Sequence, residues 1–303
     1  MSELRFADGT VVTAASALAP LAGGWLVAQD DSTFAAWVRD GGVEPLRLVP
    51  PVEGLDVFRE AEGTKHLKPD LEAATQVQAG DGTLGALLLG SGSSPRRMRG
   101  VLVLDRPDGP EVRVADLTAL YEAAARALGL DVDSLNFEGV CRSDGTLRWF
   151  NRGSLAGGVP TASVDLDHDA LVAAFLGRGA VADVGVGAPR RYDLGEVQGV
   201  GLAATDAVAL PDGRLLLSAA AEDTPNAVDD GPVVGSALAL LAPDRDDDAV
   251  LDLAPLPVVD GLVHKVEGLG ILDPLPDGVR LLAVVDADDP GVAAKQLSLT
   301  VRW

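Results

Sequence analysis

Three glutamates recur at the start of strand-like segments that lie far apart in the chain. Glu72, Glu138 and Glu267 each precede Ala or Gly, and Gln198 stands before Gly in the same way. If these segments are equivalent strands around one axis, the carboxylates converge, and they repel one another unless a cation offsets their charge. Carboxylate oxygens suit Ca²⁺ or Mg²⁺ better than zinc. The pattern therefore predicts a divalent metal site, with Ca²⁺ or Mg²⁺ held by Glu72, Glu138 and Glu267.

A structural role is the alternative for the same glutamates. Buried carboxylates commonly accept hydrogen bonds from backbone N–H groups. In that case each Glu would fasten its strand to the neighbouring one, with no ion bound.

Basic residues are scarce, and their positions coincide with those of the glutamates. Three of the four lysines come just before a Glu of this set: Lys65 and Lys68 before Glu72, and Lys265 before Glu267. Clustered Lys and Arg side chains bind phosphate or carboxylate groups. The residues predicted to bind such an anion are Lys65, Arg96, Arg97, Arg152 and Lys265. Those predicted to take part in catalysis are His66, Lys68 and His264.

A solvated surface is the alternative interpretation of the lysines. Charge clusters are commonly no more than exposed ion pairs. On such a surface Lys65, Lys68 and Lys265 would pair with Glu60, Glu62 and Asp70.

Familiar catalytic motifs are absent from the sequence. It contains no Gly-x-Ser-x-Gly, no P-loop, no Gly-x-Gly-x-x-Gly and no His-Glu-x-x-His. Cys141 is the only cysteine, which excludes an internal disulfide and a Cys-rich metal site. We expect Cys141 to lie in the core rather than to act as a nucleophile.

A repeat of about sixty residues organises these positions. A Gly-Gly or Asp-Gly pair precedes an apolar run at five places, and such pairs are strong signals for tight hairpin turns. The second residues of these pairs are Gly24, Gly82, Gly145, Gly213 and Gly278, with spacings of 58, 63, 68 and 65. About four strand-like runs fall in each interval, which is the content of a propeller blade. The sequence predicts an all-β fold, a five-bladed β-propeller formed by residues 1–303 as a single domain; the alternative is a β-sandwich or two all-β domains.

The two chain ends are predicted to close the propeller. After the second strand of the last unit only residues 295–303 remain, and residues 3–7 can supply its missing outer strand. Such closure leaves no free sheet edge between the first and last blades. Residues 117–128 and 168–177 have helical spacing instead, and we expect both to form short helices inserted between units.

Composition restricts the class of partner. With 24 basic and 46 acidic residues the formal net charge is −22, which repels phosphate backbones and anionic lipids. No apolar run approaches the roughly 20 residues that span a bilayer, and the first residues lack a secretory signal. We expect a soluble, cytoplasmic protein that binds neither nucleic acid nor membranes and has a small anionic ligand as its partner.

Together with the Glu-Gly strand starts, residues 68–73 (KPDLEA) and 88–94 (LLGSGSS) resemble uncharacterised bacterial propeller families akin to the esterase-like phytase group. The resemblance implies a β-propeller with calcium-dependent phosphatase or phosphodiester-type activity. It also implies channel acids at Glu72, Glu138 and Glu267, and rim cations at Lys68, Arg96 and Arg97. The sequence departs from the pattern where Gln198 and Ser16 replace acids, and it lacks the dense Asp cluster of a multi-calcium phytase centre.

Two functional hypotheses follow from these residues. In the first, a divalent ion on the three glutamates polarises a phosphoryl or ester oxygen, the basic residues hold the substrate anion, and a bound water attacks. In the second, the protein is a non-catalytic propeller that binds a small anion or a partner protein on the same face. The first predicts cation-dependent turnover, and the second predicts none.

Overall fold

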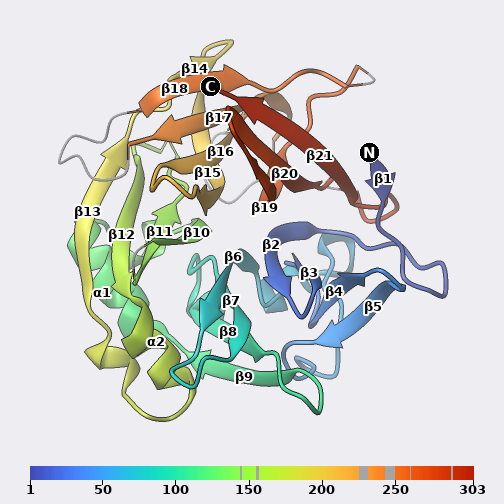
Figure 1. Cartoon of the computed structure of the whole chain (residues 1–303), viewed down its shortest axis with the longest axis vertical. Coiled ribbons are helices and arrows are strands. Elements are labelled where there is room, and N and C mark those ends of the chain that lie inside the picture. The colour runs from blue at the N-terminus through green and yellow to red at the C-terminus, as the bar shows by residue number, and fades with distance from the viewer. Residues whose placement is uncertain (144, 155–156, 225–230, 243–249, 260, 288) are drawn as a thin grey trace.

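Five small antiparallel sheets follow one another around a central axis, which confirms the predicted five-bladed β-propeller (Figure 1). The computed structural model describes residues 1–303 except 144, 155–156, 225–230, 243–249, 260 and 288. Each blade begins with an inner strand beside the axis and continues outward through hairpins. The site described below depends on where these inner strands begin and where the second strands end.

The strands of each blade are consecutive in the chain, apart from the last blade. The first blade contains β2 (Ala15–Leu21), β3 (Gly24–Gln29), β4 (Phe34–Arg39) and β5 (Gly42–Arg47). The second contains β6 (Leu71–Gln78), β7 (Leu84–Gly90), β8 (Arg99–Leu104) and β9 (Glu111–Asp116). The third contains β10 (Phe137–Ser143), β11 (Thr146–Asn151), β12 (Thr161–Asp167) and β13 (Val186–Tyr192).

The last two blades differ from this plan in detail. The fourth has an additional short strand paired with the start of its inner strand, and contains β14 (Glu196–Val197), β15 (Val200–Ala209), β16 (Leu215–Glu222), β17 (Val233–Leu241) and β18 (Val250–Pro255). The fifth contains β19 (Val266–Leu275), β20 (Gly278–Val285), β21 (Lys295–Arg302) and β1 (Ser2–Glu3).

The predicted turns join the first strand of each blade to the second. Gly82 and Gly213 adopt φ angles of 85° and 86°, which residues with a Cβ rarely tolerate. Their N–H groups donate to Ala79 O at 2.8 Å and to Leu210 O at 3.0 Å, closing the turns. Asp144, the first residue of the third predicted turn, lies outside the described residues.

The inner strand of every blade carries one extra residue near its start. The register with the second strand shifts at this residue, as in a β-bulge. The five bulge residues are Ser16, Glu72, Glu138, Thr205 and Glu267. The predicted equivalence of Glu72, Glu138 and Glu267 therefore holds at the level of backbone register.

The prediction for the fourth blade was wrong, because Thr205 and not Gln198 occupies the equivalent position. Gln198 is an exposed residue in the turn between β14 and β15, where its φ angle is 55°. Its Gln-Gly pair marks this turn rather than the start of an inner strand.

The chain ends close the ring, as predicted. Residues Ser2 and Glu3 of β1 pair with Gln296 and Lys295 of β21, and Figure 1 shows the two strands side by side. The strand is shorter than the predicted 3–7, since Leu4 turns its buried side chain inward and its N–H donates to Ala294 O at 2.8 Å.

Two helices interrupt the strands near the predicted positions. Helix α1 (Thr118–Leu128) lies between the second and third blades and ends at Gly129, whose φ angle is 69°. Helix α2 (His168–Phe175) corrects the prediction, because it lies between β12 and β13, inside the third blade. Its first residue, His168, accepts a hydrogen bond from the N–H of Gln78 at the end of β6, so the helix contacts the second blade. No helix in the described part of the chain is long and apolar enough to cross a membrane.

Short 3-10 helices lie in the connections, at Glu60–Glu62, Lys65–Leu67, Pro95–Arg97, Val132–Ser134 and Val181–Asp183.

The interior consists of apolar layers between blades and under the helices. Phe137 and Trp149 stack with ring centroids 3.7 Å apart, against Tyr121 of α1. Cys141 is buried, and burial raises the pKa of its thiol to about 12, which keeps the thiol protonated.

Candidate functional site

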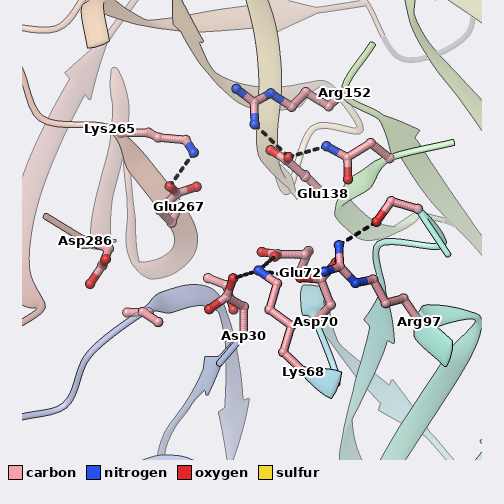
Figure 2. Close-up of a pocket in the computed structure, with 15 residues that line it drawn as sticks. Asp30, Lys68, Asp70, Glu72, Arg97, Glu138, Arg152, Lys265, Glu267 and Asp286 are labelled. Carbon is pink, nitrogen blue, oxygen red and sulfur yellow. Dashed lines mark hydrogen bonds and ion pairs between the residues drawn. The ribbon is translucent and has the colours of Figure 1, made fainter. Parts of the chain in front are cut away.

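A small cavity of about 100 Å³ lies where the inner strands begin and the second strands end. Its charged walls come from four blades or their connecting loops, and Figure 2 shows these side chains converging. The acids that line the cavity are Asp30, Asp70, Glu72, Glu138, Glu267 and Asp286. The basic residues that line it are Lys68, Arg97, Arg152 and Lys265.

The first part of the site is built around Lys68. Its Nζ pairs with Asp30, with Asp70 Oδ1 at 2.5 Å and with Glu72 Oε1 at 3.9 Å. Arg97 Nη1 lies 3.0 Å from the other oxygen of Asp70. These two cations hold three acids from the first and second blades together.

The pKa values in this part follow from burial and neighbouring charge. Burial opposes the charge of Lys68, but the surrounding carboxylates outweigh it and raise the pKa of the ammonium group well above its usual range. Burial also opposes the charge of Asp70, yet Lys68 and Arg97 lower its pKa, so it stays ionised. Burial, followed by repulsion from Asp30 and Asp70, raises the pKa of Glu72 well above its usual range.

The second part is a chain of alternating charges across three blades. Arg152 lies 2.9 Å from Glu138 and 2.8 Å from Glu222. Lys265 lies 2.7 Å from Glu222 and 2.8 Å from Glu267. The order Glu138, Arg152, Glu222, Lys265, Glu267 therefore joins the third, fourth and fifth blades.

Glu138 and Glu267, the acids at the two ends of this series of ion pairs, have pKa values above that of an ordinary glutamate. Burial raises the pKa of Glu267 to about 8, against the opposing effect of Lys265. Burial raises the pKa of Glu138 in the same way, although Arg152 opposes it. Glu222 lies between two cations, which lower its pKa despite burial.

The cavity brings together seven of the residues singled out from the sequence. These are Lys68, Glu72, Arg97, Glu138, Arg152, Lys265 and Glu267. The remaining four do not line it. Lys65 pairs with Glu60 at 3.4 Å, as the surface alternative predicted, and Arg96 pairs with Glu53 at 3.6 Å in an exposed position. His66 is exposed, and His264 lines a different hollow beside Lys265.

Four acids of the site were missed by sequence reasoning. Asp30 and Asp286 directly follow the second strands β3 and β20, and Glu222 is the last residue of β16. Arg152 occupies the matching place after β11. The sequence signal that could have identified these residues is a polar side chain at, or directly after, the end of the second strand of a blade. Asp70 stands two residues before its bulge glutamate, as Lys265 does in the fifth blade.

The carboxylates predicted to bind a divalent ion are paired with side-chain cations in this structure. Each predicted metal ligand already has a cation: Glu72 has Lys68, Glu138 has Arg152, and Glu267 has Lys265. Oxygens of Asp30, Asp70 and Glu72 do lie within 4.8 Å of one another. The ammonium group of Lys68 pairs with all three, so a metal there would have to displace it.

Fold and site define a five-bladed β-propeller with a charged cavity at one mouth of its channel. The chain belongs to a family of unknown function, DUF6910, whose family model matches residues 64–290. The matched segment contains every charged cavity residue except Asp30. No curated protein sequence matches the chain.

Several solved structures have a similar fold. A β-1,3-galactosidase of the GH43 class is 9% identical, with a TM-score of 0.51, over 99% of this chain and 58% of its own. An exo-β-1,3-galactanase from Phanerochaete chrysosporium is 10% identical, with a TM-score of 0.50, over 99% of this chain and 63% of its own. A luciferin-regenerating enzyme is 13% identical, with a TM-score of 0.42, over 95% of this chain and 78% of its own. The chain spans less than two thirds of the first two, and identities this low show the fold alone.

Proposed function

We propose that the protein binds a small ligand with a phosphate or carboxylate group in the channel-mouth cavity. The observation that carries the proposal is the convergence of four cations on one small space. The side chains of Lys68, Arg97, Arg152 and Lys265 are 11%, 15%, 12% and 11% exposed. Buried ion pairs rarely stabilise a fold more than apolar packing would, whereas charged groups gathered in a cleft are typical of ligand sites.

Protonation of the glutamates lowers the negative charge of the cavity, which favours binding of an anionic ligand. Glu72, Glu138 and Glu267 have raised pKa values, and each lies beside a cation. A proton taken up by one of these carboxyls leaves its cation with less compensation. An anion can then replace the lost charge, so anion binding is coupled to proton uptake.

Hydrolysis is the second candidate, and a difference in pKa favours it. Glu267, with a pKa of about 8, keeps its proton at neutral pH, whereas the cations beside Asp70 keep that carboxylate ionised. A protonated acid can protonate a leaving group and an ionised one can accept a proton from water. The resemblance to esterase-like phytase propellers favours phosphoesters, and the names of two similar structures refer to galactoside cleavage. Binding without turnover is the alternative.

Calorimetric titration with sulfate and with acetate tests the binding proposal. We expect Arg97→Gln to weaken binding of the anion about tenfold or more, because the variant loses a charge in the cavity wall. Arg113→Gln is the matched control, since Arg113 is 54% exposed, lies outside the cavity lining and forms an ion pair with Glu111. Arg152→Gln, which removes another charge from the cavity wall, takes its place if Arg97→Gln fails to fold. Equal affinity in Arg97→Gln and the wild type, or no binding at all, would contradict the proposal.

A panel of p-nitrophenyl phosphate, acetate and galactoside tests hydrolysis. We expect Glu267→Gln to abolish turnover of any substrate that the wild type cleaves, because Gln cannot donate a proton. Glu3→Gln, on the exposed β1, should leave turnover unchanged. No turnover across the panel would rule against hydrolysis of these ester and glycoside classes while leaving anion binding intact.

A further inference from the structure

A second, larger pocket adjoins the charged cavity. Its volume is about 440 Å³, within the range of small-molecule sites. Ala14, Asp30, Lys68 and Asp286 line both spaces. Lys68 and Asp30 therefore face both spaces, so the two pockets lie on either side of the same pair of side chains.

The outer pocket is walled by a well-defined loop between the first two blades. Phe58 is 2% exposed and its N–H donates to Asp31 O at 2.8 Å, which ties the start of the loop to the first blade. Arg59 N donates to Thr64 Oγ1 at 2.8 Å, and Gly63 N donates to Glu60 O at 2.8 Å. These bonds fix the loop before any ligand binds, which lowers the entropy cost of binding.

The lining combines apolar surface with an excess of acids. Phe58, Ala61 and Pro290 contribute apolar carbon. The acids are Asp30, Asp31, Glu60, Glu62, Asp286 and Asp289, whereas the cations are Arg59, Lys65 and Lys68. Lys65 forms an ion pair with Glu60, and Lys68 forms one with Asp30. A second negative group on a ligand would meet repulsion here, but an uncharged ring or hydrocarbon would contact the apolar wall.

We propose that the ligand carries an uncharged, largely apolar body that fills the outer pocket while its anionic group lies in the central cavity. This inference rests on the anion-binding function proposed above. It names the substrate class more narrowly: one anionic group attached to one uncharged body. Ligands with several phosphate groups are disfavoured, because their further phosphates would lie against the acidic wall that includes Glu60, Glu62 and Asp289.

Phosphonates test the proposal, because they have no ester bond to be hydrolysed. Methylphosphonate, phenylphosphonate and 4-carboxyphenylphosphonate are titrated into the full chain. We expect phenylphosphonate to bind about tenfold tighter or more than methylphosphonate, as burial of a ring in an apolar pocket predicts. The added carboxylate should remove this gain.

Ala61→Trp fills the outer pocket from an exposed position on the loop. We expect it to reduce phenylphosphonate affinity to that of methylphosphonate, whose own affinity stays unchanged. Ala180→Trp, on the exposed surface of the third blade, is the control. If Ala61→Trp fails to fold, the affinities of the wild type for the three phosphonates still test the outer-pocket proposal.

The outcomes separate the two proposals. Methylphosphonate binding with no gain from the phenyl ring overturns the outer-pocket inference and leaves anion binding intact. A gain that persists in Ala61→Trp, or that survives the added carboxylate, also overturns it. Failure of every phosphonate, sulfate and acetate to bind overturns the anion-binding function and the inference with it.

Discussion

Glu267 and Lys265 determine how the charge of the cavity responds to pH. The carboxyl of Glu267 lies 2.8 Å from Lys265 Nζ and has a pKa of about 8. Near neutral pH this carboxyl is mostly protonated, and Lys265 has Glu222 as its ionised partner. Above pH 8 Glu267 becomes a second negative neighbour. Protonation of one side chain therefore changes the net charge of the cavity within the physiological range.

Sulfate affinity should consequently fall as pH rises. Sulfate keeps a constant charge between pH 6 and pH 9, so a change in its affinity reports on the protein. We expect about a tenfold loss of affinity over this range, because ionisation of Glu267 repels the anion. Calorimetric titration at both pH values measures it. Glu267→Gln should show a weaker pH dependence, and an identical pH dependence in this variant would contradict the assignment.

The same carboxyl should make stability depend on pH. The folded state keeps its proton up to about pH 8, whereas an ordinary Glu releases it near 4.5. Between these values the folded state binds more protons than the unfolded state, so the free energy of unfolding falls as pH rises. In Glu267→Gln the side chain has no proton to release, so this part of the decrease in the free energy of unfolding is absent. We expect it to gain on the order of 2 kcal/mol relative to wild type between pH 5.5 and pH 8.5.

Urea denaturation at the two pH values measures this difference in the free energy of unfolding. Glu122→Gln, an exposed substitution on α1, controls for the change of residue type. Parallel pH dependence in wild type and Glu267→Gln would show that the proton is held elsewhere.

At the scale of elements, the bulge residues of two inner strands connect neighbouring blades. Ser16 Oγ donates to Leu71 O at 2.6 Å, and Thr205 Oγ1 donates to Val266 O at 2.6 Å. Each accepting carbonyl belongs to the residue before the next blade's bulge glutamate. A bulge residue with a hydroxyl group forms a hydrogen bond to the next blade. A bulge glutamate instead places its carboxyl group in the cavity wall.

Loss of the Thr205 hydroxyl should loosen one blade interface. Thr205 is 1% exposed, and Thr205→Val keeps its shape but leaves the Val266 carbonyl without this donor. We expect the free energy of unfolding to fall by about 1–2 kcal/mol. Thermal and urea denaturation measure it, with Thr300→Val at an exposed position of β21 as the control. Equal stability of the two variants would rule out this role of the hydroxyl.

The sequence predicts the elements better than it predicts the acids between them. Turn glycines at similar spacing located the inner hairpins, because a tight turn needs φ angles that glycine tolerates. The Gln198 assignment failed because a Gln-Gly pair also suits a turn. Distance to the following turn is the better guide: Gln198 precedes Gly213 by 15 residues, whereas Thr205 precedes it by 8, close to the other blades.

Contacts between blades explain the remaining misses in the site. Glu222 joins Arg152 of the third blade to Lys265 of the fifth, and no local pattern encodes a pairing across so many residues. Lys68 was identified from its proximity to Glu72 in sequence. Its pairing with Asp30 of the first blade depends on how the blades meet, which only the assembled ring specifies.

At the scale of the whole molecule, the joint between the first and last blades is an apolar cluster as well as a strand pair. Leu4 is 1% exposed and belongs to a cluster with Val12, Val27, Val284 and Ala294. The backbone bonds of Leu4 run to Ala294 on one side and from Val12 on the other. This short segment is therefore packed from both blades.

Leu4→Ala should destabilise the entire propeller rather than its terminus alone. The substitution leaves a cavity at the joint, and we expect a loss of about 2–4 kcal/mol in the free energy of unfolding. Leu84→Ala, at a residue that is 46% exposed, is the control. Urea denaturation followed by both circular dichroism and tryptophan fluorescence measures it. A loss no greater than that of the control would mean that the joint contributes little.

The pairing of β1 with β21 also bears on how the protein is made. Ser2 and its neighbour Gln296 are separated by 294 positions, so the first strand must wait until β21 has left the ribosome. At ordinary rates of synthesis this delay is roughly 15 to 60 seconds. During that time the earlier blades can assemble, but the first blade has an open side that only the last one covers. The ring, with the channel-mouth site that depends on it, is therefore completed only after β21 has been synthesised.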